Sequence, residues 1–200
     1  MSSLFETLLG QLDGEPLSQI GSQLGLDENA TRKAVPAALA SLMGGLAGNT
    51  SRGGGAEALL GALQRDHDGS VLDSLSSVIT NPQAASGSGI LRHVFGTNQS
   101  AVTSGLSRGT GVSSDSMSQL LTMLAPMVLG ALGKTQKERG LDAGGLSDLL
   151  GSERETIRRA SPEGLGVLGQ LLDADGDGQI ADDVAKLGAG LLGSLFGKRR

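Results

Sequence analysis

The residues best equipped for chemistry form an acidic loop near the C-terminus. Asp173, Asp175 and Asp177 stand at alternate positions, and Gly178 follows them directly. This is the spacing of the first half of an EF-hand calcium loop, in which alternate carboxylates converge on one ion and the glycine permits a sharp turn. That turn would aim the backbone carbonyl of Gln179 at the ion. The pattern therefore predicts a calcium site.

The end of the loop departs from the EF-hand pattern. Val184 occupies the twelfth position, where a standard loop carries a bidentate Glu. Asp183, one residue earlier and one methylene shorter, can complete a tighter loop, while Asp182 can reach the ion through water. We therefore expect Ca²⁺ to bind with modest affinity. The alternative is a solvated Asp-Gly turn in which Asp182 or Asp183 caps the last helix.

A weaker version of this loop lies in the first half of the chain. It keeps four matching residues, Asp66, Asp68, Gly69 and Asp73. Gln64 stands at the first ligand position and His67 replaces a Gly, and a lone His is a poor ligand for a hard cation. We therefore predict a structural turn without metal.

Other catalytic chemistry finds little support in the sequence. The chain has no Cys and two His, which excludes disulfides, thiolate metal sites and a Cys nucleophile. His93 has no readable carboxylate and nucleophile around it, so we expect it to be packed or hydrogen-bonded within the structure. The sequence thus predicts a protein that is not an enzyme.

The elements that must position the acidic loop are predicted to be helices. Leu far outnumbers the β-branched Ile and Val, which favours an all-α fold. Apolar residues recur at intervals of three and four over residues 34–46 and 117–132, after the candidate N-caps Asp27 and Ser113. Pro36 and Pro126 lie inside these two helices. Gly-rich residues 48–55, 81–89 and 133–145 are predicted to be loops.

The two predicted helices also belong to an internal repeat. A shift of 86 residues superposes the matching residues Ile20 and Leu106, Gly25 and Gly111, Leu26 and Val112, Ala34 and Leu120, Val35 and Leu121, Gly44 and Gly130, and Leu46 and Leu132. A longer shift superposes the two Asp-Gly loops. We therefore expect two similar multi-helix halves from a duplication, residues 1–80 with the degenerate loop and residues 90–200 with the EF-hand-like loop, which can pack as one domain.

Charge and apolar patterning bear on partners and location. The net charge of −5, without an aromatic-rich basic patch, argues against nucleic-acid binding. The apolar residues 120–132 cover most of a helix circumference but are too few for a membrane span. Residues 31–46 and the C-terminal segment are also strongly apolar, and we expect that one small core cannot cover all three segments, which predicts a homo-oligomer. The competing account is a monomer with residues 120–132 as its central helix. Residues 1–6 show no secretory signal, so the expected location is cytoplasmic.

The apolar residues 184–196 with the basic residues 198–200 leave two possibilities open. The segment can pack as a helix on the core or on a partner subunit, and its weakly polar face favours this. The alternative is a helix on an anionic membrane surface, although such helices usually carry a strongly charged face.

Three features together resemble one bacterial family. They are the residues from His93 to Gln99 followed by Val102, the apolar helix of residues 120–133, and the loop of Asp173, Asp175, Asp177 and Gly178 with Asp182 and Asp183. Their combination is similar to bacterial domain-of-unknown-function family 937, related to YidB-like proteins, over most of the chain. The resemblance implies an all-helical bacterial protein without an assigned catalytic activity. We expect a non-enzymatic structural or interaction protein that binds calcium; the alternative is a membrane-surface or envelope-associated protein.

Overall fold

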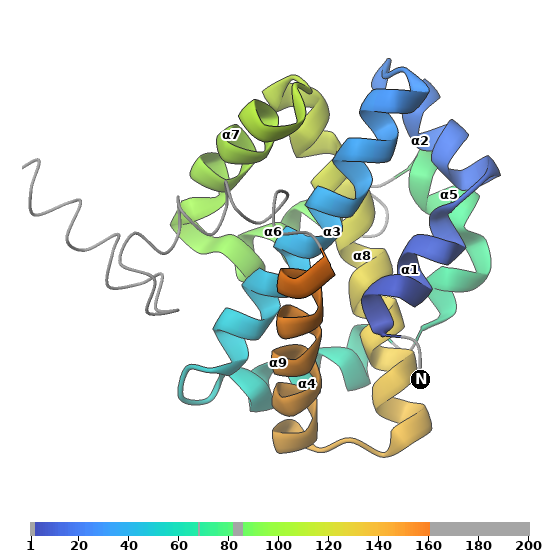
Figure 1. Cartoon of the computed structure of the whole chain (residues 1–200). Coiled ribbons are helices and arrows are strands. Elements are labelled where there is room, and N and C mark those ends of the chain that lie inside the picture. Colours follow the sequence, from blue (N-terminus) through green and yellow to red (C-terminus); the bar gives the residue numbers. More distant parts are fainter. Residues whose placement is uncertain (1–2, 68, 82–85, 161–200) are drawn as a thin grey trace, which may run out of the picture.

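The computed structural model describes residues 3–67, 69–81 and 86–160, and every regular element in these ranges is a helix (Figure 1). The predicted all-α class is confirmed. The elements are α1 (Leu4–Leu12), α2 (Glu15–Leu24), α3 (Glu28–Thr50), α4 (Gly55–Asp66), the 3-10 helix η1 (Ser70–Ser74), α5 (Leu75–Thr80), α6 (Gly87–Phe95), the 3-10 helix η2 (Gly96–Asn98), α7 (Gln99–Thr110), α8 (Ser114–Arg139) and α9 (Ala143–Ala160).

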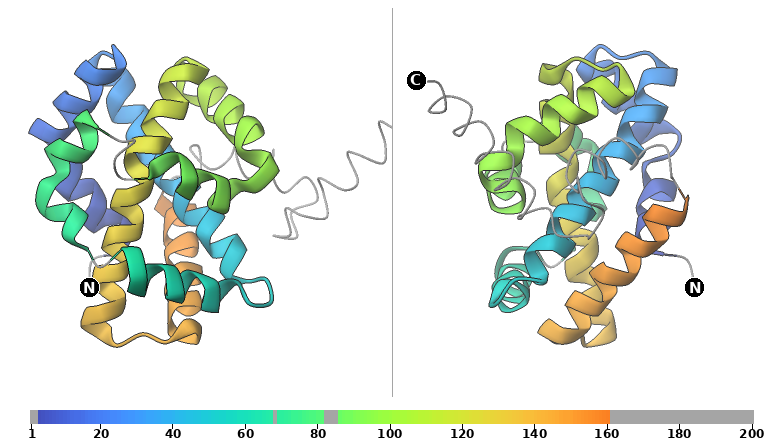
Figure 2. Two further views of the ribbon diagram at one scale, coloured as in Figure 1. Left: turned by 180° about the vertical axis from the view of Figure 1, so that it is seen from behind. Right: turned by 60° about the vertical axis from the view of Figure 1, so that its left-hand side comes forward.

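The two longest helices, α3 and α8, pack against each other at the centre of the molecule (Figure 1). α9 packs along α3, α6 packs along α8, and α4 contacts both α8 and α9. Seen from behind, the short helices surround α8 on its remaining sides (Figure 2). One apolar core of residues from both halves of the sequence therefore runs along this central pair.

α8 is enclosed by its own chain. Residues 120–133 are all buried, and Leu120, Leu121 and Leu124 are completely inaccessible to solvent. α8 is long and apolar enough to cross a membrane by length and composition, but 83% of its most apolar stretch is buried inside the molecule. Residues 120–132 thus form the central helix of a single chain, as the competing monomer account requires, while the covering of the C-terminal apolar segment lies outside the described residues. The shorter helices cover it on every side, so its burial needs no partner subunit.

Local capping fixes where the two central helices begin. The Asp27 side chain accepts a hydrogen bond from the Ala30 amide at 2.8 Å, and the Ser113 hydroxyl accepts one from the Ser116 amide at 3.1 Å. Both predicted N-caps are confirmed. Pro36 and Pro126 lie inside their helices without ending them. The preceding helices α2 and α7 each end at a left-handed glycine, Gly25 and Gly111.

Two of the predicted loops are shorter than expected. α3 continues through the Gly-rich start of residues 48–55 as far as Thr50, and α8 continues into residues 133–145 as far as Arg139. At the end of α3, packing of the buried Thr50 outweighs the helix-breaking tendency of Gly. Residues 134–139 of α8 contain no Gly and are mainly good helix formers, so helix propensity extends this helix. α8 ends where Gly140 adopts a left-handed conformation with φ of 62°. The third predicted loop falls partly on residues 82–85, outside the described ranges.

Glycines allow close approach of shorter elements to the central pair. A Cβ atom on Gly130 of α8 would collide with the Val71 side chain of η1, and one on Gly45 of α3 would lie 2.7 Å from Val94 of α6. By contrast, a Cβ on Gly10 of α1 would meet no atom within 4 Å. Gly130 and Gly45 lower the helix propensity of α8 and α3, but they allow η1 and α6 to pack closely on these helices.

We predict that Gly130→Ala destabilises the protein by about 1–3 kcal/mol, because the added methyl must displace Val71 in a packed contact. Gly10→Ala is the matched control and should stabilise by roughly 0.5–1 kcal/mol, because an exposed helical Gly gains propensity without a clash. Urea unfolding of both variants measures the difference. Equal stabilisation by both substitutions would contradict the packing of η1 on α8.

Candidate functional site

The predicted calcium ligands Asp173, Asp175, Asp177, Gln179 and Asp183, and the alternative Asp182, lie outside the described residues. The same holds for the C-terminal segment of residues 184–200. Within the part that the structure describes, no three His, Asp or Glu side chains come together as a metal-binding group. The geometry available for this kind of loop is therefore that of its counterpart in the first half.

The first-half loop connects α4 to η1, and its Asp68 lies outside the described residues. α4 ends at Asp66, and Gly69 has a φ of 100°, a left-handed conformation that side chains other than Gly rarely adopt. The Leu72 amide then donates a hydrogen bond to the Gly69 carbonyl at 3.0 Å and begins the 3-10 turn. The glycine at this position thus allows the left-handed conformation from which η1 begins.

This turn is seated on α8. A Cβ atom on Gly69 would lie 2.9 Å from the Lys134 Cβ and 3.3 Å from the Gly130 carbonyl oxygen. Two positions further on, Val71 lies against Gly130 and belongs with the side chains that pack on the core. In the alignment of the two Asp-Gly loops, Val71 corresponds to Ile180, an apolar residue of the second loop. The described residues of the first loop therefore dock a turn onto the central helix.

The described carboxylates of the first loop, Asp66 and Asp73, lie at the surface. Asp66 is exposed and lies 3.9 Å from the Arg65 guanidinium, and Asp73 is also exposed. His67 is half-buried; burial lowers the pKa of this imidazole, and the nearby Asp66 carboxylate partly offsets the shift. A neutral His and outward carboxylates suit a packed turn better than a cation site.

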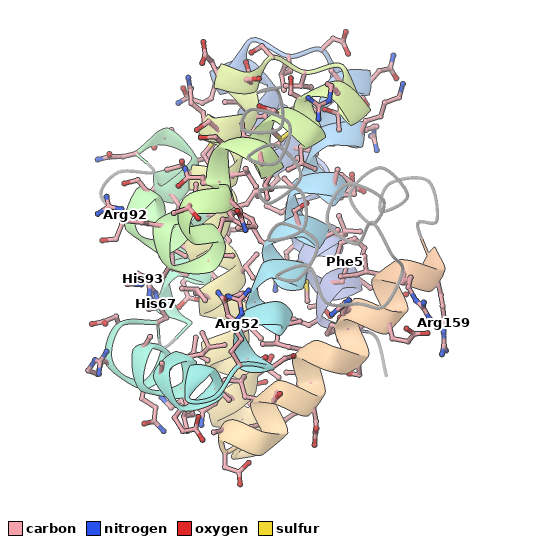
Figure 3. The ribbon with its side chains drawn as sticks, turned by 90° about the vertical axis from the view of Figure 1, so that its left-hand side faces the viewer. Phe5, Arg52, His67, Arg92, His93 and Arg159 are labelled. Atoms are coloured by element: carbon pink, nitrogen blue, oxygen red, sulfur yellow. The ribbon has the colours of Figure 1, made fainter. Side chains whose placement is uncertain are left out.

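The structure reveals one buried acid that the sequence analysis missed. Glu153 of α9 is 4% exposed, and its two carboxylate oxygens accept hydrogen bonds from the Leu4 amide at 2.8 Å and the Phe5 amide at 3.0 Å. These amides are free donors at the start of α1, where the helix dipole also favours a negative charge. Glu153 therefore holds the N-terminal helix against α9, near Phe5 in Figure 3.

A sequence signal for Glu153 was available. Leu146, Leu150 and Ile157 recur at helical spacing and are buried, and Glu153 stands in the same stripe. An acid inside an apolar stripe must find a partner, because burying an unpaired charge is costly. Ser152 and Glu155 have the spacing of a capping box, which would predict a helix start here, but both residues lie inside α9.

The remaining polar candidates lie at the surface. The His93 side chain is exposed, so the expectation of a packed His is wrong; its carbonyl instead accepts a hydrogen bond from the Asn49 amide group at 3.1 Å. Among the described residues, a shallow hollow of about 360 Å³ is lined by Glu15, Ser18, Gln19, Ser22, Gln23 and Thr80. It contains one ionisable group, which gives it no acid–base pair.

Comparison with known protein families identifies a match for most of the chain. A model of the family described as bacterial protein of unknown function, DUF937, matches residues 6–135 and 137–200. The chain belongs to this family. The resemblance drawn from the sequence motifs is thereby confirmed. In the other two comparisons, no curated protein and no solved structure matches the chain.

We predict that Glu153→Ala lowers the free energy of unfolding by about 2–4 kcal/mol, because it leaves two buried amide donors without acceptors. Glu153→Gln keeps one acceptor oxygen and should cost about half as much. Glu155→Gln, on an exposed carboxylate of the same helix, is the control and should leave the melting temperature unchanged. Thermal unfolding measures all three, and an unchanged melting temperature for Glu153→Ala would contradict the contact.

Proposed function

We propose that this protein is a non-enzymatic structural or interaction protein built from two duplicated helical halves, residues 1–80 and 90–200, of which the second binds calcium. The observation that supports the proposal is the turn at Gly69. In the first half, a loop with this Asp-Gly pattern follows a helix and packs on the core, and the acidic loop of the second half has the same pattern. The calcium ligands would be Asp173, Asp175, Asp177, the Gln179 carbonyl and Asp183.

Equivalent local structures in the two halves support the duplication. Residues 86 apart end α2 and α7 with left-handed Gly25 and Gly111, and N-cap α3 and α8 with Asp27 and Ser113. The other superposed pairs are buried or partly buried in both halves, as Ile20 and Leu106 illustrate. The helix–glycine–cap–helix order therefore occurs twice, as a repeated unit would require.

The chemistry of the second loop supports calcium. Three carboxylates at alternate positions repel one another unless a cation neutralises them, and oxygen ligands at this spacing suit Ca²⁺. The missing bidentate Glu at Val184 implies a dissociation constant of roughly 10⁻⁵ to 10⁻³ M.

A non-enzymatic role agrees with how the described part uses its polar groups. Both oxygens of the buried Glu153 accept backbone hydrogen bonds, which leaves this acid unavailable as a general base. The buried Thr31 and Thr122 hydroxyls donate to carbonyls of their own helices. These groups stabilise the fold and do not converge on a substrate. The cytoplasmic location stays a prediction from residues 1–6.

We predict that calcium raises the melting temperature of the full chain, because an ion that binds the native state stabilises it by mass action. Asp175→Ala should abolish both this shift and the heat of binding in calorimetry. Asp66→Ala, at the matching position of the first loop, should leave both intact. Absence of a thermal shift and of binding heat in millimolar calcium would refute the calcium site, as would equal loss in the two variants.

Self-association remains part of the proposal but depends on fewer residues than the sequence suggested. Because residues 120–133 of α8 are buried within one chain, the apolar residues 184–196 are the principal candidates for a contact between copies. Light scattering at micromolar concentration should give a mass above 20.1 kDa that falls on deletion of residues 184–200. A mass near 20.1 kDa across a hundredfold dilution series would contradict self-association.

The alternative is a membrane-surface or envelope-associated protein that uses the same C-terminal segment. The basic Lys198, Arg199 and Arg200 after an apolar stretch favour it, because such residues attract anionic lipids. Flotation with anionic vesicles separates the two proposals. Loss of flotation on deletion of residues 184–200 would favour the membrane; no flotation of the full chain would exclude it.

A further inference from the structure

One stripe of the central helix α3, called the bare stripe below, has no described neighbour above its glycines Gly44 and Gly48. Ala37, Ser41, Gly44 and Gly48 follow one another at intervals of three and four, so they line a single stripe. Ala37, Gly44 and Gly48 are only partly buried. No described atom lies within 4 Å of a Cβ built on Gly44 or Gly48.

The neighbouring faces of α3 are occupied. On one side, α6 packs so closely that a Cβ on Gly45 would lie 2.7 Å from Val94, and Asn49 donates hydrogen bonds to the end of α6. α9 also packs along α3. Figure 3 looks onto the side where α3 runs between these helices. Ser41, on the bare stripe, is 8% exposed, and its buried hydroxyl has no hydrogen-bond partner among the described residues.

The equivalent stripe on α8 is covered by the first loop. The 86-residue shift superposes Gly44 on Gly130 and Gly48 on Lys134. These two residues of α8 are the ones that receive the loop: Val71 lies against Gly130, and Gly69 lies against Lys134. A loop that follows α4 thus closes this stripe of α8, and the loop of the other half follows α9.

We infer that the C-terminal acidic loop docks on the bare stripe of α3, with Ile180 against Gly44 and Gly178 beside Gly48. The loop alignment supplies the pairing, because Ile180 matches Val71 and Gly178 matches Gly69. The inference rests on the duplication in the proposed function and does not require calcium. Its occupant is residues 178–182 of the same chain, in place of a second copy or another protein.

The connection is long enough for this docking. α9 rises along α3 to about the middle of the molecule, where the described chain ends at Ala160 (Figures 1 and 2). Residues 161–177 can span up to roughly 50 Å at about 3.3 Å per residue, more than α3 itself requires. A tethered segment also competes strongly with any separate partner, because its effective concentration is high.

The docking also gives a reason for the different carboxylate content of the two loops. The first loop lies beside Lys134, which places a cationic side chain on its helix. The matching residue of α3 is Gly48, which supplies no charge there. The three Asp of the second loop would therefore depend on a cation from solution, in agreement with the calcium proposal.

A disulfide trap tests the docking directly, because the full chain has no native cysteine. The double variant Ile180→Cys with Gly44→Cys should oxidise within the monomer, since bridged cysteines need Cα atoms about 4.4–6.8 Å apart. Val71→Cys with Gly130→Cys is the positive control for the described contact. Ile180→Cys with Gln23→Cys, on an exposed residue of α2, is the control for random encounter.

We expect the Ile180–Gly44 pair to oxidise at least about tenfold faster than the Ile180–Gln23 pair, through a higher effective concentration. Peptide mapping by mass spectrometry identifies the link. Equal rates for the two pairs would overturn the inference. A cross-linked dimer as the main product would overturn it as well, because the occupant would then be a second copy.

A second measurement avoids cysteines. Gly44→Ala should fail to raise the melting temperature in the native chain, because its methyl would meet Ile180, whereas Gly10→Ala should raise it. In an Ile180→Asp background, Gly44→Ala should raise it as Gly10→Ala does. Equal gains from Gly44→Ala and Gly10→Ala in the native chain would contradict the docking.

Running the disulfide trap with calcium and with chelator separates this inference from the proposed calcium site. Fast Ile180–Gly44 oxidation in a chain that binds no calcium would refute the calcium site and leave the docking standing. Calcium binding by calorimetry without preferential oxidation of this pair would refute the docking and leave the calcium site standing.

Discussion

The fold depends on the contact between α3 and α8. α8 is buried around its whole circumference over residues 120–133, and α3 buries most of its side chains between Ala34 and Ala47. Two such helices cannot cover each other alone, because each leaves most of its surface uncovered. The shorter helices must therefore surround the pair. Glycines at the contact points let these elements approach the central helices closely.

The polar contacts determine where the helices begin and which helices lie side by side. Asp27 and Ser113 determine where the two central helices begin, and Asn49 connects the end of α3 to the end of α6. Glu153 joins the beginning of the chain to α9, across 148 and 149 residues of sequence to Phe5 and Leu4. Hydrophobic burial is not directional, so these contacts supply the register that burial alone would leave open.

The sequence was sufficient for what depends on local pattern, and it was insufficient for what depends on tertiary packing. The all-α class followed from composition, both N-caps from residue type and spacing, and the family from the resemblance of three motifs. The end of α8 was placed too early, because residues 134–139 contain no Gly and are mainly good helix formers. The sequence left open whether one chain covers α8, since a periodic pattern shows that a face is buried but not what covers it. The candidate calcium loop stays a prediction from the spacing of Asp173, Asp175 and Asp177, while its first-half counterpart shows how such a turn sits on a central helix.

Native-state hydrogen exchange tests the enclosed central pair most directly. Amides of residues 120–132 should exchange only through global unfolding, with a free energy equal to that from urea denaturation. Protection should be the same at low and high protein concentration, because one chain covers α8 completely. Exchange of these amides by local opening at a much lower free energy, or protection that rises with protein concentration, would contradict the account.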